Sequence, residues 1–233
     1  MVSSPTSPTC WILKPQIAEL SNLNTNNTLR PLFVDLDGTL IAADLGQEAF
    51  FAAIKAKPWL LPAMPFYAAQ GLAKFKSRLA KIIVPAVQTL PYHDDVLAEL
   101  KRLKAAGHPL ILTTASHRVW AEPMAEHLGL FDDVLATDAQ TNLKGANKLA
   151  AIQSYCQAHG WSEFEYWGDA PVDLHIWSAP TSARIVTVNP SNATLAAIRT
   201  TGKELLLFQN QGSRWQGVLA ALRPQEWLKY LLL

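Results

Sequence analysis

From Pro31 onward, short apolar runs alternate with longer segments whose apolar residues recur at helical spacing. This alternation is typical of parallel strands joined by helices. Most of the runs place apolar residues at consecutive positions, as strands buried on both faces of a sheet do. We therefore predict a doubly wound, Rossmann-like parallel α/β sheet. The predicted strands are residues 32–36, 109–114, 133–137, 163–167, 183–188 and 204–208.

Three connections between these strands are predicted helices, at residues 93–108, 118–130 and 145–160, and each closes near a glycine. Residues 44–90 break the alternation, because they are almost wholly helix-compatible and hold no convincing strand. We predict that they form a small helical cap inserted after the first strand. Three prolines divide this segment, Pro58, Pro62 and Pro65.

Composition excludes several classes of protein. The chain has 233 residues, 49% hydrophobic and 17% charged, which suits one globular domain with an appendage. Its net charge of +1 gives no electrostatic footprint for nucleic acid, so we expect no nucleic-acid partner. Cys10 and Cys156 are far apart and form no zinc-ligand spacing, which fits a reducing cytosol. We expect a cytoplasmic protein.

The two ends of the chain differ from its body. Residues 1–29 are rich in Ser, Pro, Thr and Asn and are predicted to be a flexible leader rather than a secretory signal. No run reaches the roughly 18 to 20 apolar residues that span a bilayer. Residues 213–233 form an apolar tail, which fits either an amphipathic helix docked on the body or a membrane-interface helix at the inner face of the membrane. The remaining residues, 30–43 and 91–212, form the predicted core, which contains the sheet.

Two acids follow the first predicted strand, in the sequence PLFVDLDGTL at residues 31–40. Asp35 and Asp37 point to the same side if the extended backbone persists, and two such close carboxylates repel each other. A hard cation such as Mg²⁺, which takes oxygen ligands, would resolve this repulsion. The alternative is a simple turn, since Asp-Gly after a strand is common.

Hydroxyl and amino groups occur where later strands end or helices begin. Thr114 and Ser116 end the second strand and could hold a phosphate oxygen, or they could cap the following helix. Lys148 lies near the start of a helix, with Lys144 just before it. The helix dipole does not favour a cation there, so Lys148 either serves a site or is merely a solvated side chain.

The sequence YWGDAPVDL, at residues 166–174, again places acids at the carboxyl end of a strand. Gly168 would allow close approach of the backbone. Asp169 could be a metal ligand and Asp173 its outer-shell partner, although Asp173 could also be only a helix cap. Reactive groups in open parallel sheets gather at this edge, so we expect these residues to lie near Asp35.

In chain order, these four pieces resemble the motifs of the haloacid dehalogenase (HAD) superfamily of phosphohydrolases, over roughly residues 30–210. The resemblance implies that Asp35 is the nucleophile that forms an aspartyl-phosphate, which water then hydrolyses. Asp37 would protonate the leaving oxygen and later activate the water. Mg²⁺ would be held by Asp35, the backbone carbonyl of Asp37, and Asp169. The implied activity is that of a phosphatase acting on a small phosphorylated substrate.

The same resemblance implies the remaining roles. Thr114, Lys148 and Gly38 would bind the phosphoryl group, and Lys148 would also offset the charge on nucleophile and phosphate. Asp173 would support the metal site from outside. Ser116 remains an alternative to Thr114, because both lie near the end of the strand.

A second resemblance involves a membrane partner. The whole chain is similar to the soluble HAD-like region fused ahead of UbiA-type prenyltransferases, including TNLKG at 141–145 and RPQEWLKYLLL at 223–233. It implies a split or shortened form whose usual partner is a membrane prenyltransferase, so the alternative role is docking on or regulating such an enzyme. The sequence does not identify the substrate, for which a lipid-linked or sugar phosphate is one candidate. The apolar residues of the cap would form either its interior or a surface for lipid. They are Trp59, Leu60, Leu61, Met64, Phe66 and Tyr67.

Overall fold

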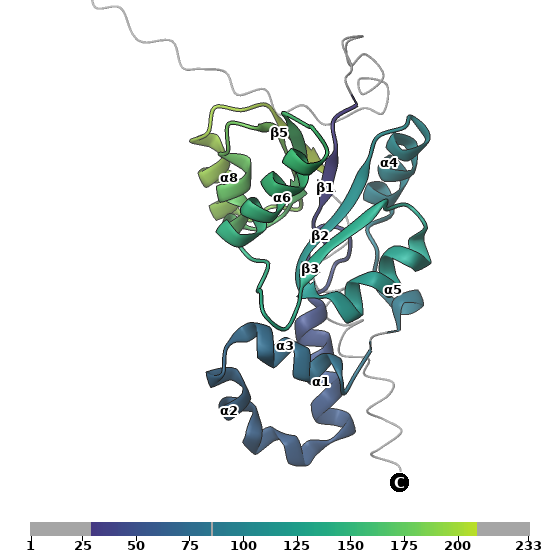
Figure 1. Ribbon diagram of the computed structural model, residues 1–233, viewed down its shortest axis with the longest axis vertical. Helices are drawn as coiled ribbons and strands as arrows, with labels where there is room; N and C mark the ends of the chain where they lie inside the picture. The colour runs from purple at the N-terminus through teal and green to yellow at the C-terminus, as the bar shows by residue number, and fades with distance from the viewer. Residues whose placement is uncertain (1–28, 85, 209–233) are drawn as a thin grey trace, which may run out of the picture.

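Six parallel strands form one sheet in the computed structural model, which describes residues 29–84 and 86–208 (Figure 1). The strand order is β3-β2-β1-β4-β5-β6. Because the chain leaves β1 first toward β2 and later returns beside it as β4, the order reverses between β1 and β4, which is where open α/β sheets bind ligands. The strands are β1 (Leu32–Val34), β2 (Leu110–His117), β3 (Asp133–Thr137), β4 (Phe164–Gly168), β5 (Ser182–Val188) and β6 (Leu205–Phe208).

All six predicted strands are present, and β3 has the predicted bounds. The largest difference is at β2, which continues to His117 instead of ending at 114. Its pairing with β3 shifts register between Thr114 and His117, so the extra residues belong to an irregular stretch at the carboxyl end of the strand. Runs of apolar residues cannot reveal such a shift, because Ser116 and His117 are polar and Ala115 is small.

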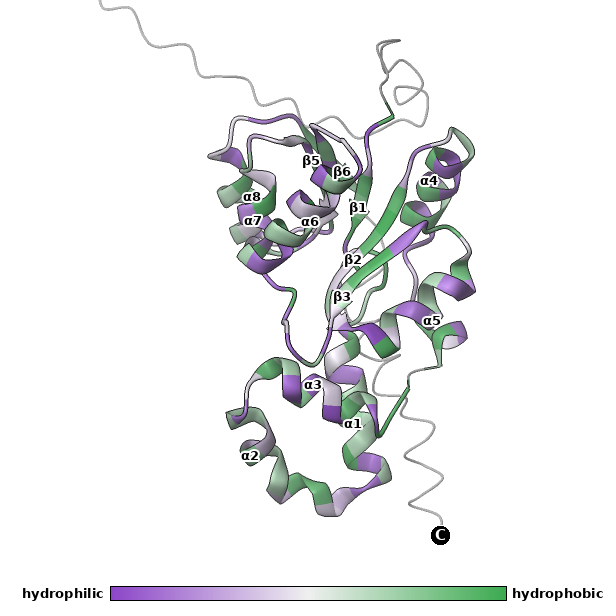
Figure 2. Ribbon diagram, viewed as in Figure 1, coloured by the Kyte–Doolittle hydropathy of each residue, from purple (hydrophilic) through white to green (hydrophobic). Residues whose placement is uncertain are grey.

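Helices cover both faces of the sheet. On one face, α4 (Asp94–Ala105) and α5 (Arg118–Leu128) pack with Val34 in one hydrophobic cluster. On the other face, α6 (Ala146–Ala158), α7 (Leu174–Trp177) and α8 (Asn192–Arg199) pack with Phe33 in a second cluster. Phe33 and Val34 are neighbours on β1, so their side chains point to opposite faces of the sheet, and both side chains are fully buried. Figure 2 shows β1 as hydrophobic, as a central strand covered on both faces must be.

The cap follows β1, as predicted. It comprises α1 (Leu45–Ala56), the 3-10 helix η2 (Pro58–Ala63), α2 (Met64–Ala69) and α3 (Leu72–Ala80). The Asp44 side chain accepts a hydrogen bond from the Gln47 N–H and so caps α1, and Pro58 begins η2 after α1 has ended. The cap lies beyond the end of the sheet and contacts β2 through α1 and α3 (Figure 1). Two short 3-10 helices complete the fold, η3 (Val87–Thr89) and η4 (Pro171–Asp173).

The apolar residues of the cap divide between its interior and its surface. Met64 is buried, whereas Trp59, Leu61 and Phe66 are exposed by 72%, 54% and 66%. Met64 therefore belongs to the interior of the cap, whereas a lipid-binding role of the exposed residues stays a prediction. The predicted leader and the apolar tail lie outside the described residues. Within those residues, no helix has the length and apolar character needed to cross a membrane.

Candidate active site

Asp35 follows β1 directly and is buried, with 8% of its surface exposed. The apolar residues on either side of it, Val34 and Leu36, are fully buried and hold the backbone in place. One Asp35 oxygen accepts a hydrogen bond of 2.8 Å from the Leu36 N–H. The other lies 3.0 Å from Lys148 Nζ. Asp35 is therefore oriented by a backbone donor and by a cation, which a turn residue would not need.

The Asp37 carboxylate connects the cap to the core. Its Oδ1 accepts a 2.8 Å hydrogen bond from the Leu45 N–H, at the start of α1. Its Oδ2 accepts a 2.7 Å bond from Ser116 Oγ, and Thr114 Oγ1 lies 3.5 Å away. The carboxylate is thus held between the first turn of the cap and the end of β2.

Thr114 and Ser116 do not cap the helix that follows them. The N-cap of α5 is His117, whose Nδ1 accepts a hydrogen bond from the Val119 N–H. Thr114 Oγ1 instead accepts a 2.9 Å bond from the Ser116 N–H. The capping alternative is therefore wrong, and both hydroxyls point into the site.

Lys148 is buried, with 3% of its surface exposed, so the solvated-lysine alternative is wrong. It lies on the first turns of α6, and its Nζ donates a 2.8 Å hydrogen bond to the Tyr166 hydroxyl. That hydroxyl donates a 2.9 Å bond to Asp173 Oδ1, which lies 3.9 Å from Lys148 Nζ. Tyr166, on β4, therefore links Lys148 to Asp173 by hydrogen bonds, while Lys148 also pairs with Asp35.

Three carboxylates meet at the carboxyl ends of β1 and β4. Oxygens of Asp35, Asp169 and Asp173 all lie within 4.8 Å of one another, an arrangement that could hold a metal ion. Two glycines make room for it. Gly38 has φ +76, and a Cβ there would lie 2.1 Å from Asp169 Oδ2. A Cβ on Gly168 would lie 2.6 Å from Asp173 Oδ2.

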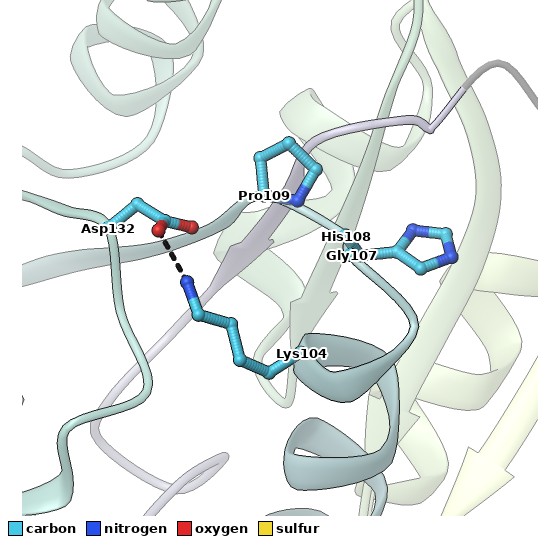
Figure 3. Close-up of a pocket in the computed structure, with 5 residues that line it drawn as sticks. All are labelled: Lys104, Gly107, His108, Pro109 and Asp132. Carbon is cyan, nitrogen blue, oxygen red and sulfur yellow. Dashed lines mark hydrogen bonds and ion pairs between the residues drawn. The ribbon is translucent and has the colours of Figure 1, made fainter.

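A surface pocket lies away from these acids. It is lined by Lys104, Gly107, His108, Pro109 and Asp132, at the amino end of β2 (Figure 3). Lys104 and Asp132 form an ion pair there, and Asp132 Oδ2 also accepts a 2.9 Å hydrogen bond from the Leu110 N–H. These contacts connect α4 and β2 to the residue just before β3. They give Asp132 a structural role, so its presence does not require a ligand in the pocket.

The family model of haloacid dehalogenase-like hydrolases matches residues 32–177, which include every acid described above. The chain belongs to this family. The order of the four motifs predicts this membership.

Individual relatives extend the comparison. The uncharacterized protein y4nM of Sinorhizobium fredii is 33% identical over 209 residues, which are 87% of this chain and 38% of that protein. The chain thus spans well under half of this curated relative. A Bordetella pertussis protein of unknown function has a similar structure, with a TM-score of 0.61, 17% identity, and coverage of 77% of this chain and 99% of that one. The structure of an apo phosphoserine phosphatase is similar with a TM-score of 0.54 and 14% identity. The match covers 79% of this chain and 96% of that one. These structural likenesses show the shared HAD fold.

Burial gives the acids of this HAD hydrolase unusual proton affinities. It raises the pKa of Asp35 to about 7; Lys148 opposes this shift, and Asp173 and Asp37 add to it. Burial, with Asp35 and Asp173, raises the pKa of Asp169 to about 8. Burial alone would lower the pKa of Lys148, but its acidic neighbours raise it, so Lys148 stays charged. One cation therefore faces several acids that cannot all ionise cheaply.

Sequence reasoning missed two side chains of the HAD site. Tyr166 lies inside a buried strand, and its sequence context, EFEYW, reads as core. Lys76 lies on α3 of the cap, and its Nζ donates a 2.5 Å hydrogen bond to the Ala115 carbonyl, between Thr114 and Ser116. No spacing within the sequence links a cap lysine to β2, because the contact spans the boundary between cap and core.

A divalent cation is expected to stabilise the hydrolase more at pH 8 than at pH 5.5. The folded-state pKa values of Asp35 and Asp169 lie above the ordinary value of 3.8. Without metal, the folded state therefore binds more protons than the unfolded state, and stability falls as pH rises from about 4 to about 8. Bound metal replaces those protons, so the rise in Tm on adding Mg²⁺ should grow over this window.

Thermal unfolding with Mg²⁺ and with a chelator, at both pH values, checks this expectation. Asp169→Asn should lose the Mg²⁺-dependent rise in Tm, whereas Glu126→Gln, an exposed acid on α5, should keep it. An equal rise in the Asp169→Asn variant would count against a metal at this cluster.

Proposed function

We propose that this chain is a Mg²⁺-dependent phosphomonoester hydrolase that works through an aspartyl-phosphate on Asp35. The observation that carries the proposal is the buried ion pair between Asp35 and Lys148, placed beside Asp169 and Asp173 at the point where the strand order reverses. A structural carboxylate would need no such combination of a cation, a second acid pair and a position at the ligand crevice.

Asp35 and Asp37 have environments that suit different steps. An Asp35 oxygen attacks phosphorus, and the bond to the leaving oxygen breaks while Asp37 gives that oxygen a proton. A water molecule then attacks phosphorus while Asp37 takes its proton. The bond between phosphorus and the Asp35 oxygen breaks, which releases inorganic phosphate and regenerates the Asp35 carboxylate. Burial and the neighbouring Asp44 raise the pKa of Asp37, although the Leu45 N–H and the Ser116 hydroxyl lower it. A raised pKa favours a proton on this carboxylate, as its first task requires.

The other residues of the site would manage charge. Lys148 offsets the negative charge that Asp35 and the phosphoryl oxygens bring together. Thr114 or Ser116 would donate a hydroxyl hydrogen bond to a phosphoryl oxygen. The Gly38 N–H donates a 3.3 Å hydrogen bond to the Ala43 carbonyl in this structure, so Gly38 would bind the phosphoryl group only by exchanging that bond. Asp35, the Asp37 carbonyl and Asp169 would hold Mg²⁺, with Asp173 supporting them. When bound, the ion would neutralise charge on the phosphoryl group.

The proposed activity is tested with 4-nitrophenyl phosphate, followed by release of inorganic phosphate. We expect turnover with Mg²⁺ and none after chelation. A screen of phosphorylated metabolites under the same two conditions then addresses the substrate, for which lipid-linked and sugar phosphates are our first candidates. Mg²⁺-independent turnover would overturn the metal assignment.

A second candidate role is docking at a membrane, alone or beside a UbiA-type prenyltransferase. The surface of the cap favours it, because Trp59, Leu61 and Phe66 are exposed. Residues 45–84 also contain six basic residues and one acid. Exposed aromatic residues among lysines are typical of surfaces that bind anionic membranes. Docking and hydrolysis are compatible in one chain.

Flotation with anionic phospholipid vesicles is expected to carry part of the full chain upward. Leu61→Glu, on the cap, should reduce the floating fraction, because it places a negative charge against an anionic surface. Val119→Glu is the matched control, since Val119 is exposed by 42% on α5 of the core. Deletion of residues 215–233 tests the tail separately. An unchanged soluble fraction with vesicles would count against docking.

A further inference from the structure

Lys76 crosses from the cap into the catalytic site. It lies on α3, and its Nζ donates a hydrogen bond to the Ala115 carbonyl at the end of β2. The next residue adds a second contact between the cap and the core, because Ser77 Oγ lies 2.9 Å from His117 Nε2. His117 Nδ1 accepts from the Val119 N–H, so in the neutral ring Nε2 carries the proton and donates to Ser77. This turn of α3 is therefore fixed against the core.

The ammonium of Lys76 has no carboxylate partner in the described structure. Among residues 29–84 and 86–208, no ion pair within 4.0 Å includes Lys76. Its side chain is half-buried, and burial lowers its pKa, while Asp37 and Asp44 raise it. The carbonyl of Ala115 satisfies one of its three donors. A partly desolvated cation with donors to spare is suited to receive an anion.

The position of Lys76 indicates which part of a substrate it would meet. Its Nζ bonds the carbonyl of Ala115, and the residues on either side, Thr114 and Ser116, direct their hydroxyls at Asp37 Oδ2. Asp37 is the acid that we assign to the leaving oxygen. Lys148, on α6, instead contacts Asp35, the nucleophile. In an in-line displacement the nucleophile and the leaving group lie on opposite sides of phosphorus. Lys76 therefore belongs to the side of the leaving group.

We propose that Lys76 binds a second anionic group of the substrate, a carboxylate or a second phosphate, carried by the leaving group. This proposal rests on the proposed hydrolase function, since it takes Asp37 as the acid for the leaving oxygen. It makes Lys76 a residue that determines specificity. The preferred substrates are then phosphomonoesters with a further negative charge near the ester oxygen, and neutral alkyl phosphates are poor substrates.

Matched substrates test the proposal in the full chain. Ethyl phosphate carries no second charge, phosphoglycolate adds a carboxylate, and ethylene glycol bisphosphate adds a phosphate. We expect kcat/KM to be about 10- to 100-fold higher for at least one of the charged pair than for ethyl phosphate, as for a charged hydrogen bond. The charged substrate with the higher kcat/KM identifies which anion, carboxylate or phosphate, Lys76 prefers.

Variants of Lys76 separate recognition from structure. Lys76→Met should remove the preference for the charged substrates over ethyl phosphate, and Lys76→Arg should restore part of that preference. Lys74→Met is the control, because Lys74 is exposed on the same helix. A merely structural lysine would lower turnover of all three substrates equally. That result, or an unchanged preference in Lys76→Met, would overturn the proposal.

Binding distinguishes this proposal from the hydrolase proposal. In the Asp35→Asn background, calorimetry should show that the preferred charged phosphate binds about 10-fold or more tightly than ethyl phosphate, and that Lys76→Met abolishes the difference. If the wild-type chain hydrolyses nothing but this difference persists, the hydrolase mechanism fails and the anion site stands. Equal binding of all three phosphates would overturn the anion site.

Discussion

Asp35→Asn is expected to lower phosphatase turnover by about 10⁴-fold or more, the scale of removing a nucleophile that acts with its partners as a unit. The amide is nearly the same size as the carboxylate and can still accept the hydrogen bond from the Leu36 N–H. It cannot form the acyl phosphate, because an uncharged amide oxygen is a poor nucleophile. The expected loss is therefore chemical rather than structural.

Three measurements make this expectation decisive. Phosphate release from 4-nitrophenyl phosphate gives the rate, and circular dichroism with thermal unfolding shows whether the variant is folded. Removing one acid from a crowded cluster relieves repulsion, which offsets the loss of the pair with Lys148. Glu126→Gln should retain full turnover, since Glu126 is exposed on α5. Substantial turnover by a folded Asp35→Asn variant would refute the aspartyl-phosphate mechanism.

Lys148→Met is expected to damage both turnover and stability. It removes the cation that contacts Asp35 and lies near Asp173, so the acids lose their compensating charge. Breaking a buried pair from one side costs about 3–5 kcal/mol. Turnover should fall by about 10³-fold, the scale for removing one preorganised donor to a developing charge.

The stability loss in Lys148→Met should depend on pH. Lys148 lowers the pKa of Asp35 in the wild-type chain, so its removal raises that pKa further. A raised folded-state pKa gives stability that is present at low pH and lost as pH rises. Chemical denaturation should therefore show a larger deficit at pH 8 than at pH 5.5. Lys144→Met is the matched control, because Lys144 is exposed just before the same helix. A deficit that does not change with pH would count against the pair with Asp35.

Local patterns were sufficient for most of the fold. Most strands of this sheet contain runs of apolar residues, because the central strands are buried on both faces, and this pattern can be recognised without knowing the neighbouring strands. The cap was recognised for the opposite reason, as helix-compatible sequence where the alternation stops. The end of β2 was misjudged, because its last residues are polar and their extended conformation depends on pairing with β3.

The sequence by itself determined the order of the strands along the chain and the family. It also predicted the acids and Lys148 as candidate site residues, since each motif directly follows a strand or opens a helix. Only the tertiary structure decided what those residues touch. Lys148 is buried against Asp35 rather than solvated, Tyr166 joins it to Asp173, and Lys76 reaches β2 from the cap. These contacts join residues far apart in the chain, and their energies depend on burial and distance, which only the folded arrangement of strands and helices fixes.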